Sequence, residues 1–189
     1  MKRIQVGIIG TGWIGGIRAH TCANHPLVEA IHLAEIDTAR LTQVANETRA
    51  RTATTDYHEL LNRPEIDAII VASTPETTHY PFTRDCLLAR KHTFLEKPMG
   101  IELKEADELM RLAREANLKL TIGYTQRFNP KYAYVKRCLE DGTLGRPVTA
   151  LVSRNISRSL GNKIDGRVRL SPAVMEAWRR GRGDQVTTG

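Results

Sequence analysis

A glycine-rich turn, Gly10-Thr11-Gly12-Trp13-Ile14-Gly15, decides how the chain folds. It matches the pattern G-x-G-x-x-G, which is a weak signal when it stands alone. Here an apolar strand pattern at residues 3–9 precedes the turn, and a helical pattern follows it from about Trp13 until just before Pro26. In this strand–turn–helix context, such glycines hold the phosphates of a dinucleotide.

Each glycine of the turn has its own expected role. Gly10 permits the tight turn, Gly12 lets the backbone approach a pyrophosphate, and Gly15 lets helix and strand pack closely. The helix N-terminus adds free N–H groups and a partial positive charge. The motif therefore predicts cofactor contacts at Gly10, Gly12, Trp13, Ile14 and Gly15, with a purely structural turn as the alternative.

Strand and helix patterns alternate through residues 1–123. Strands are expected at residues 3–9, 28–34, 51–53, 67–73, 92–95 and 119–123. Helices are expected between them, at residues 13–25, 37–48, 56–63, 76–89 and 102–117. This alternation is typical of a doubly wound parallel sheet, and six strands complete a Rossmann domain. We therefore predict an α/β fold with a dinucleotide-binding domain at residues 1–123.

The pattern changes after residue 123. A helix is expected from Pro130 to about Asp141, a strand at residues 147–155 and a further helix at residues 172–180. We predict that residues 124–189 begin an α+β substrate domain that the chain does not complete. A lone strand with an open edge favours pairing with another chain, so we expect a homo-oligomer.

Composition narrows the class of protein. No run of about 18 apolar residues and no secretory signal pattern is visible, which predicts neither a membrane span nor export. The cysteines Cys22, Cys86 and Cys138 are few, odd in number and far apart, as expected for reduced thiols in a cytoplasm. No spacing of ligands predicts a metal site.

The positive charge lies mostly at one end of the chain. Of the net charge of +7, a balance of +6 belongs to residues 146–189, which hold nine Lys and Arg against three Asp and Glu. Such a tail can indicate nucleic-acid binding, but its only aromatic residue is Trp178. An ordinary basic surface is the preferred interpretation.

Glu35 is expected to select the cofactor. It ends the second predicted strand, twenty residues after Gly15. A carboxylate there accepts hydrogen bonds from ribose hydroxyls and repels a 2′-phosphate, so NAD is preferred over NADP. The next residue is Ile36, at a position where an arginine could favour NADP. Arg40 is a candidate to weaken the preference for NAD. Asp37 is interpreted as a helix cap.

Three further motifs follow the turn in order: Ser73-Thr74-Pro75 with His79, Glu96-Lys97-Pro98, and Gly123-Tyr124-Thr125-Gln126-Arg127-Phe128-Asn129-Pro130. From about residue 3 to 175 the chain thereby resembles the Gfo/Idh/MocA oxidoreductases, the glucose–fructose oxidoreductase and inositol dehydrogenase group. The combination is far more specific than any one motif. The resemblance implies NAD-dependent oxidation of a secondary alcohol of a sugar, polyol or inositol by hydride transfer.

The resemblance also implies a role for each motif. Lys97 would be catalytic, because a lysine between nicotinamide and substrate can orient the alcohol and stabilise developing negative charge. The alternative for Lys97 is an exposed charge at a strand end. Because a proline follows Lys97, the sequence permits a cis Lys97–Pro98 peptide bond. The implied cofactor contacts are Ser73, Thr74, Pro75, His79, Glu96, Lys97, Gln126 and Arg127.

Several of these residues have a structural alternative. His79 could instead be a histidine on a helix face, bonded to a backbone group. Arg127 could make only a salt bridge. Tyr124 and Phe128 are expected to be packing residues rather than catalytic ones.

One expected group is missing from the sequence. Members of the family supply an acid/base histidine after the stretch that here ends near Met175-Glu176, but this chain has no histidine after His92. Asp165 is the only plausible acid in the matching region. The alternatives to an active dehydrogenase are therefore a non-catalytic NAD-binding regulator and a truncated, inactive member of the family. A frameshift near Ala177 would explain the abrupt loss of resemblance.

Overall fold

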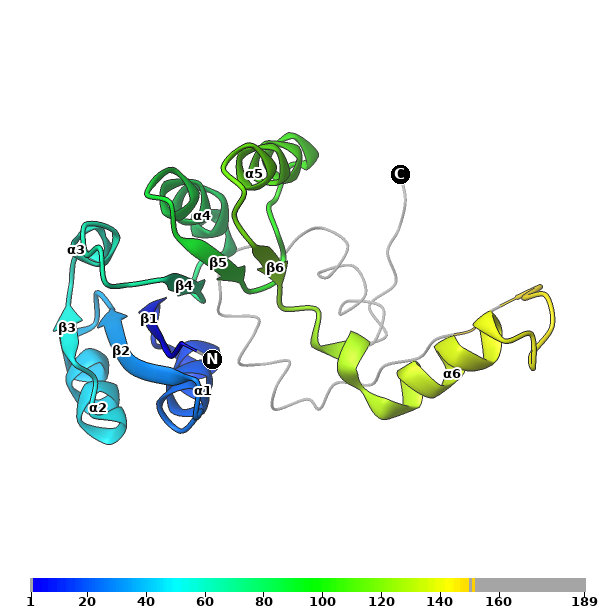
Figure 1. Cartoon of the computed structure of the whole chain (residues 1–189), viewed down its shortest axis with the longest axis horizontal. Coiled ribbons are helices and arrows are strands. Elements are labelled where there is room, and N and C mark those ends of the chain that lie inside the picture. Colours follow the sequence, from blue (N-terminus) through cyan, green and yellow to red (C-terminus); the bar gives the residue numbers. More distant parts are fainter. Residues whose placement is uncertain (1, 150, 152–189) are drawn as a thin grey trace, which may run out of the picture. The chain divides into compact units, whose positions relative to one another are not determined.

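Six parallel strands form the sheet in the computed structural model, which describes residues 2–149 and 151 (Figure 1). Their order is β3-β2-β1-β4-β5-β6, and every neighbouring pair is parallel. The strands are β1 (Ile4–Ile9), β2 (Val28–Ala34), β3 (Thr52–Thr54), β4 (Ala68–Val71), β5 (His92–Leu95) and β6 (Leu120–Ile122). The strand order reverses between β1 and β4, so the predicted doubly wound fold is confirmed.

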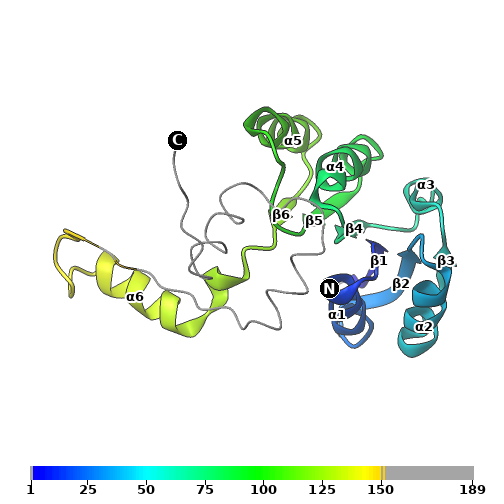
Figure 2. The same cartoon turned by 180° about the vertical axis from the view of Figure 1, so that it is seen from behind.

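Helices cover both faces of this sheet (Figures 1 and 2). Helices α1 (Trp13–Ala23) and α2 (Thr38–Thr48) lie on one face. The other face carries α3 (Tyr57–Leu61), α4 (His79–Leu88) and α5 (Leu103–Glu115). A right-handed crossover between neighbouring parallel strands places helices in this way.

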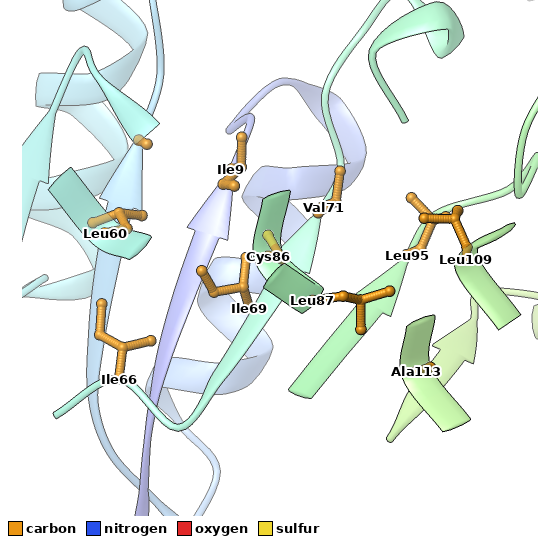
Figure 3. Packing of buried hydrophobic residues seen from close by; sticks show 11 residues of the cluster. Ile9, Leu60, Ile66, Ile69, Val71, Cys86, Leu87, Leu95, Leu109 and Ala113 are labelled. Carbon is orange, nitrogen blue, oxygen red and sulfur yellow. The ribbon is translucent and has the colours of Figure 1, made fainter. Parts of the chain in front are cut away.

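Two hydrophobic clusters lie between the helices and the sheet. The cluster under α3, α4 and α5 includes Ile69, Val71, Leu87, Leu95 and Leu109, all nearly inaccessible to solvent (Figure 3). The cluster under α1 and α2 is built around side chains of β1 and β2. Because the central strands are covered on both sides, their sequences are continuous apolar runs rather than alternating patterns.

Local capping explains where several helices begin. The side chain of Asp37 accepts a hydrogen bond from the backbone N–H of Arg40 at 3.0 Å, which confirms the predicted cap of α2. Asp56 caps α3 in the same way through the N–H of His58, at 2.9 Å. The helix predicted at residues 76–89 is instead a 3₁₀ turn, η1 (Glu76–Thr78), followed by α4, because such turns often form the first turn of a helix.

The chain divides into two compact units, Met1–Gly123 and Tyr124–Gly189. The described part of the second unit holds the 3₁₀ turn η2 (Thr125–Phe128) and α6 (Pro130–Glu140). The predicted helix over 130–141 is confirmed, with Asn129 capping the N–H of Lys131 at 3.0 Å.

Most remaining predictions for the second unit fall outside the described residues. Residues 147–149 belong to no helix or strand. Apart from residue 151, the rest of the predicted strand at 147–155 lies outside the described part, as does the predicted helix at 172–180. That residues 124–189 begin a substrate domain stays a prediction. None of the helices in the described part of the chain has the length and apolarity to cross a membrane.

Close backbone packing makes two glycines of the turn necessary for folding. Gly10 has a φ of +86°, and a Cβ there would lie 2.7 Å from the Cα of Ser73. A Cβ at Gly15 would overlap with the carbonyl oxygen of Gly10. The turn therefore holds α1 against the ends of β1 and β4 only because these positions have no side chain.

We expect Gly15→Ala to lower the free energy of unfolding by about 3 kcal/mol, because the new methyl group meets backbone that cannot move aside. The matched control is Gly12→Ala, since no atom of the described part of the chain lies within 4 Å of a Cβ at Gly12. The free energy of unfolding of the control should stay within about 1 kcal/mol of the wild-type value. Urea unfolding followed by circular dichroism measures both, and equal stability of the two variants would contradict the packing described here.

Candidate functional site

The motifs of the first unit meet at one edge of the sheet. Gly10 follows β1, Ser73 comes shortly after β4, and Glu96 follows β5. The carboxyl ends of parallel strands share an edge, and ligands of doubly wound folds bind there. The backbone N–H of Glu96 donates to the carbonyl oxygen of Val71 at 2.9 Å, which joins the ends of β4 and β5.

The N-terminus of α1 is available to an anion. Helices α2, α3 and α6 each have a side-chain cap, whereas in the described chain no side chain caps α1 and its first turn carries no acidic residue. The side chains of Trp13 and Ile14 are 61% and 39% exposed. The free N–H groups and the positive end of the helix dipole thus lie beside Gly12, where the protein leaves space.

Glu35 is anchored to the glycine turn. Its Oε2 accepts hydrogen bonds from the backbone N–H of Thr11 at 2.6 Å and from the Thr11 hydroxyl at 3.3 Å, and its Oε1 accepts from the N–H of Asp37 at 3.2 Å. A carboxylate has about four acceptor positions, so one remains, on Oε1, for a ribose hydroxyl. The half-buried side chain is thereby fixed beside the turn, which sequence reasoning did not foresee.

Arg40 binds the same turn from α2. Its Nε donates to the carbonyl oxygen of Thr11 at 2.8 Å, and one terminal nitrogen donates to that of Gly12 at 3.4 Å. Another terminal nitrogen donates to the side chain of Gln43 at 3.0 Å. A carboxylate and a guanidinium, those of Glu35 and Arg40, therefore both contact the residues that a cofactor would approach.

His79 ties together the loops that follow β4 and β5. The side chain is buried, with Nδ1 2.7 Å from the carbonyl oxygen of Pro98 and Nε2 3.1 Å from that of Ser73. The alternative of a histidine bonded to the backbone is thus the arrangement observed, and its contact with a cofactor stays a prediction. The Thr74–Pro75 peptide bond in the loop after β4 is cis.

Two hydroxyl groups form hydrogen bonds within the same loop. The Ser73 and Thr78 hydroxyl oxygens lie 2.6 Å apart, and that of Thr78 donates to the carbonyl oxygen of Pro75 at 2.7 Å. Thr74 and Pro75 are exposed. The predicted cofactor contacts of this loop stay predictions.

Glu96 and Lys97 differ sharply in their surroundings. The Lys97–Pro98 bond is cis. The Lys97 side chain is exposed, and among the described residues no group accepts a hydrogen bond from its ammonium. Glu96 is buried and paired with Arg18 of α1, at 2.5 Å between Nη2 and Oε1. Sequence reasoning missed Arg18, although its position one turn after Gly15 was a signal.

The predicted residues of the second unit lie in or beside η2. Gln126 and Arg127 are exposed, and the Gln126 side chain accepts a hydrogen bond from that of Asn129 at 3.3 Å. No ion pair involves Arg127 within the described chain, so its structural alternative has no support there. Tyr124 and Phe128 are 47% and 82% exposed. Their role in packing stays a prediction, since most of the second unit lies outside the described residues.

Other buried ionisable groups lie away from this edge. Lys91 precedes β5, at the opposite end of the strand, and its Nζ donates to the carbonyl oxygens of Arg63 and Ile66 at 2.6 and 2.9 Å. Burial lowers the pKa of Lys91 and also that of His32, which lies between side chains of Gln5 and Thr52. Both groups serve the fold rather than the candidate site.

The fold, the glycine turn and the loops at the sheet edge together define a Rossmann domain of the dinucleotide-binding type. The Gfo/Idh/MocA family model, described as an oxidoreductase family with an NAD-binding Rossmann fold, matches residues 4–124. The chain belongs to this family, as its motifs predicted.

Characterised relatives include inositol dehydrogenases. The myo-inositol 2-dehydrogenase of Thermotoga maritima is 30% identical over 153 residues, covering 80% of this chain and 46% of that protein. The NADP⁺-dependent scyllo-inositol 2-dehydrogenase IolW of Bacillus subtilis is 28% identical over 188 residues, covering 98% of this chain and 47% of that protein.

Among solved structures, scyllo-inositol dehydrogenase of Lactobacillus casei with bound NAD(H) and scyllo-inositol matches with a TM-score of 0.71. It is 27% identical, and the match covers 76% of this chain and 43% of that protein. The chain therefore spans less than half the length of these relatives.

We expect His79→Leu to lower the free energy of unfolding by about 2–4 kcal/mol, because it removes the buried imidazole between the carbonyl oxygens of Ser73 and Pro98 and the hydrogen bond that its N–H donates there. His20→Leu is the control, since His20 is exposed and its ring nitrogen pairs with the exposed side chain of Glu47. The control should change stability by less than about 0.5 kcal/mol. Equal effects in urea unfolding would show that His79 does not join the two loops.

Proposed function

We propose that the turn at residues 10–15 binds NAD(H), in a dehydrogenase that oxidises a secondary alcohol of a sugar, polyol or inositol. The observation that carries the proposal is Gly12. Its φ of −56° does not require glycine, and among the described residues no neighbouring atom lies within 4 Å of a Cβ there. The fold itself does not need a glycine at this position, whereas a bound pyrophosphate does.

The residues at the sheet edge fit the parts of the cofactor. The turn and the N-terminus of α1 hold the phosphates, and Glu35, beside β2, accepts from the adenosine ribose. The loops after β4 and β5 serve the nicotinamide end through Ser73, Thr74, Pro75, His79, Glu96 and Lys97. Gln126 and Arg127 are the further cofactor contacts that the family resemblance implies. NAD supplies the hydride acceptor.

Lys97 supplies the protein's part of the chemistry in this proposal. Its exposed ammonium can donate a hydrogen bond to the substrate oxygen, orient the alcohol and stabilise the negative charge that develops as the hydroxyl proton leaves.

The names of the relatives support polyols, inositols among them, as substrates. NAD is preferred over NADP because of Glu35. Free cysteines at three separate positions support a cytoplasmic protein, which we expect to form a homo-oligomer.

A two-step experiment tests this proposal. Calorimetric titration with NAD is followed by absorbance at 340 nm with a panel of inositols, polyols and sugars. Turnover that Lys97→Met abolishes supports the dehydrogenase. Binding of NAD without turnover supports only the cofactor site, and no binding contradicts the proposal.

We expect Gly12→Ala to weaken NADH binding by about tenfold or more, which corresponds to about 1.4 kcal/mol. The new methyl group would occupy the space that the pyrophosphate needs, while the fold stays intact. Thr21→Ala is the control because Thr21 lies near the other end of the same helix, where its exposed hydroxyl donates to the carbonyl oxygen of Ile17. NADH fluorescence titration measures both, and unchanged affinity in Gly12→Ala would overturn the proposed cofactor site.

We expect Glu35→Gln to reduce the preference for NADH over NADPH by about tenfold. The amide keeps an acceptor for the N–H of Thr11 but removes the charge that repels a 2′-phosphate, and it leaves the guanidinium of Arg40 beside the turn. Glu47→Gln, an exposed change on the same helix as Arg40, should leave the ratio unchanged. Titrations with both cofactors decide, and an unchanged ratio in Glu35→Gln would contradict the assigned selectivity.

A further inference from the structure

A partly buried ion pair connects α1 to the end of β5. The Nε and Nη2 atoms of Arg18 both donate to Oε1 of Glu96, at 2.9 and 2.5 Å. The side chains of Arg18 and Glu96 are only 25% and 11% exposed. The Arg18 guanidinium also lies over the ring of Phe94 in β5, 5.1 Å from its centre. Arg18 is therefore held by both a carboxylate and an aromatic face.

The far side of the Glu96 carboxylate rests against Gly123. A Cβ at Gly123 would lie 2.9 Å from Oε2 and 3.1 Å from the carboxyl carbon. The N–H of Gly123 donates to the carbonyl oxygen of Leu95 at 2.8 Å, so the end of β6 keeps this glycine in place. The carboxylate is thus enclosed between α1 and the residue after β6.

Such a pair is poorly explained by stability alone. Removing two charges from water costs free energy that their attraction often does not recover, and apolar side chains of similar size can stabilise a fold as well or better. What the pair adds is a fixed geometry, because two guanidinium nitrogens share one carboxylate oxygen. Its position is informative, since Glu96 directly precedes Lys97 and Arg18 lies one turn after Gly15.

We infer that the Arg18–Glu96 pair positions the nicotinamide end of the site by holding the backbone of Lys97 at a fixed place relative to α1. Lys97 is held on both sides: the Glu96 side chain bonds to Arg18, and the Pro98 carbonyl oxygen bonds to His79. The Lys97 side chain itself stays exposed. Arg18 and Glu96 are positioning residues in this account, which rests on the proposed binding of NAD.

The test compares two ligands that differ only at the nicotinamide end. ADP-ribose contains the adenosine and both phosphates of NADH but lacks the nicotinamide. In Arg18→Gln and in Glu96→Gln of the full chain, the affinity for NADH should fall by about tenfold, while that for ADP-ribose should stay within about twofold. The double variant should bind NADH no more weakly than either single variant, because both changes remove the same interaction.

Two further variants separate positioning from general damage. Gly123→Ala displaces the Glu96 carboxylate from the opposite side without touching Arg18, and it should also weaken NADH binding selectively. Arg111→Gln removes an arginine from the exposed Arg111–Glu115 pair on α5, whose nitrogen and oxygen are 2.7 Å apart, and should change neither affinity. If Arg18→Gln fails to fold, Gly123→Ala still tests the inference.

A second measurement does not depend on the cofactor. Hydrogen–deuterium exchange with mass spectrometry should show faster exchange over residues 95–101 in Arg18→Gln and Glu96→Gln, with residues 4–9 unchanged and no effect in Arg111→Gln. Equal losses for NADH and ADP-ribose, unchanged NADH affinity, or faster exchange throughout the sheet would overturn the inference. If the wild type binds neither ligand, the proposed function fails, and the exchange data alone still decide whether the pair fixes the loop.

Discussion

The close contact between Gly15 and the carbonyl oxygen of Gly10 is the constraint on which the rest of the structure depends. It holds the first turn of α1 against the end of β1, and the contact between Gly10 and Ser73 places the end of β4 beside the same turn. No side chain could occupy either position. The helix N-terminus is consequently fixed at the point where the strand order reverses, which is where doubly wound sheets bind ligands.

Other contacts extend this arrangement to both sides of the turn. On one side, Glu35 and Arg40 bond to the backbone of residues 11–12. On the other, Arg18 bonds to Glu96, and His79 joins the loops that follow β4 and β5. The candidate site is thus a set of loops bonded to one another by side chains from α1, α2 and α4. This bonding, rather than the strands alone, gives a cofactor site a defined shape.

Sequence reasoning recovered the fold because the relevant signals are local. Continuous apolar runs mark strands covered on both faces, and Asp37 and Asn129 cap helices whose first residues follow directly. The glycine spacing likewise places the turn. The strands predicted at residues 3–9, 67–73 and 119–123 are longer than those observed, since the residues next to a strand carry little pattern.

The connections within the site could not be predicted in this way. Arg18 and Glu96 are separated by 78 positions, and His79 and Pro98 by 19, so no periodicity relates them. Glu35 fits a known motif position, but its bonds to Thr11 depend on how β1 and β2 pair. Such contacts follow from the tertiary fold, and only the paired strands bring the partners together.

The central claim is that the turn at residues 10–15 binds NAD, and backbone amide chemical shifts test it most directly. Titration of the ¹⁵N-labelled chain with NAD⁺ should produce its largest shift changes at residues 11–15, with smaller changes near Glu35 and Lys97. An absence of changes, or changes confined to residues away from the carboxyl edge of the sheet, would contradict the account.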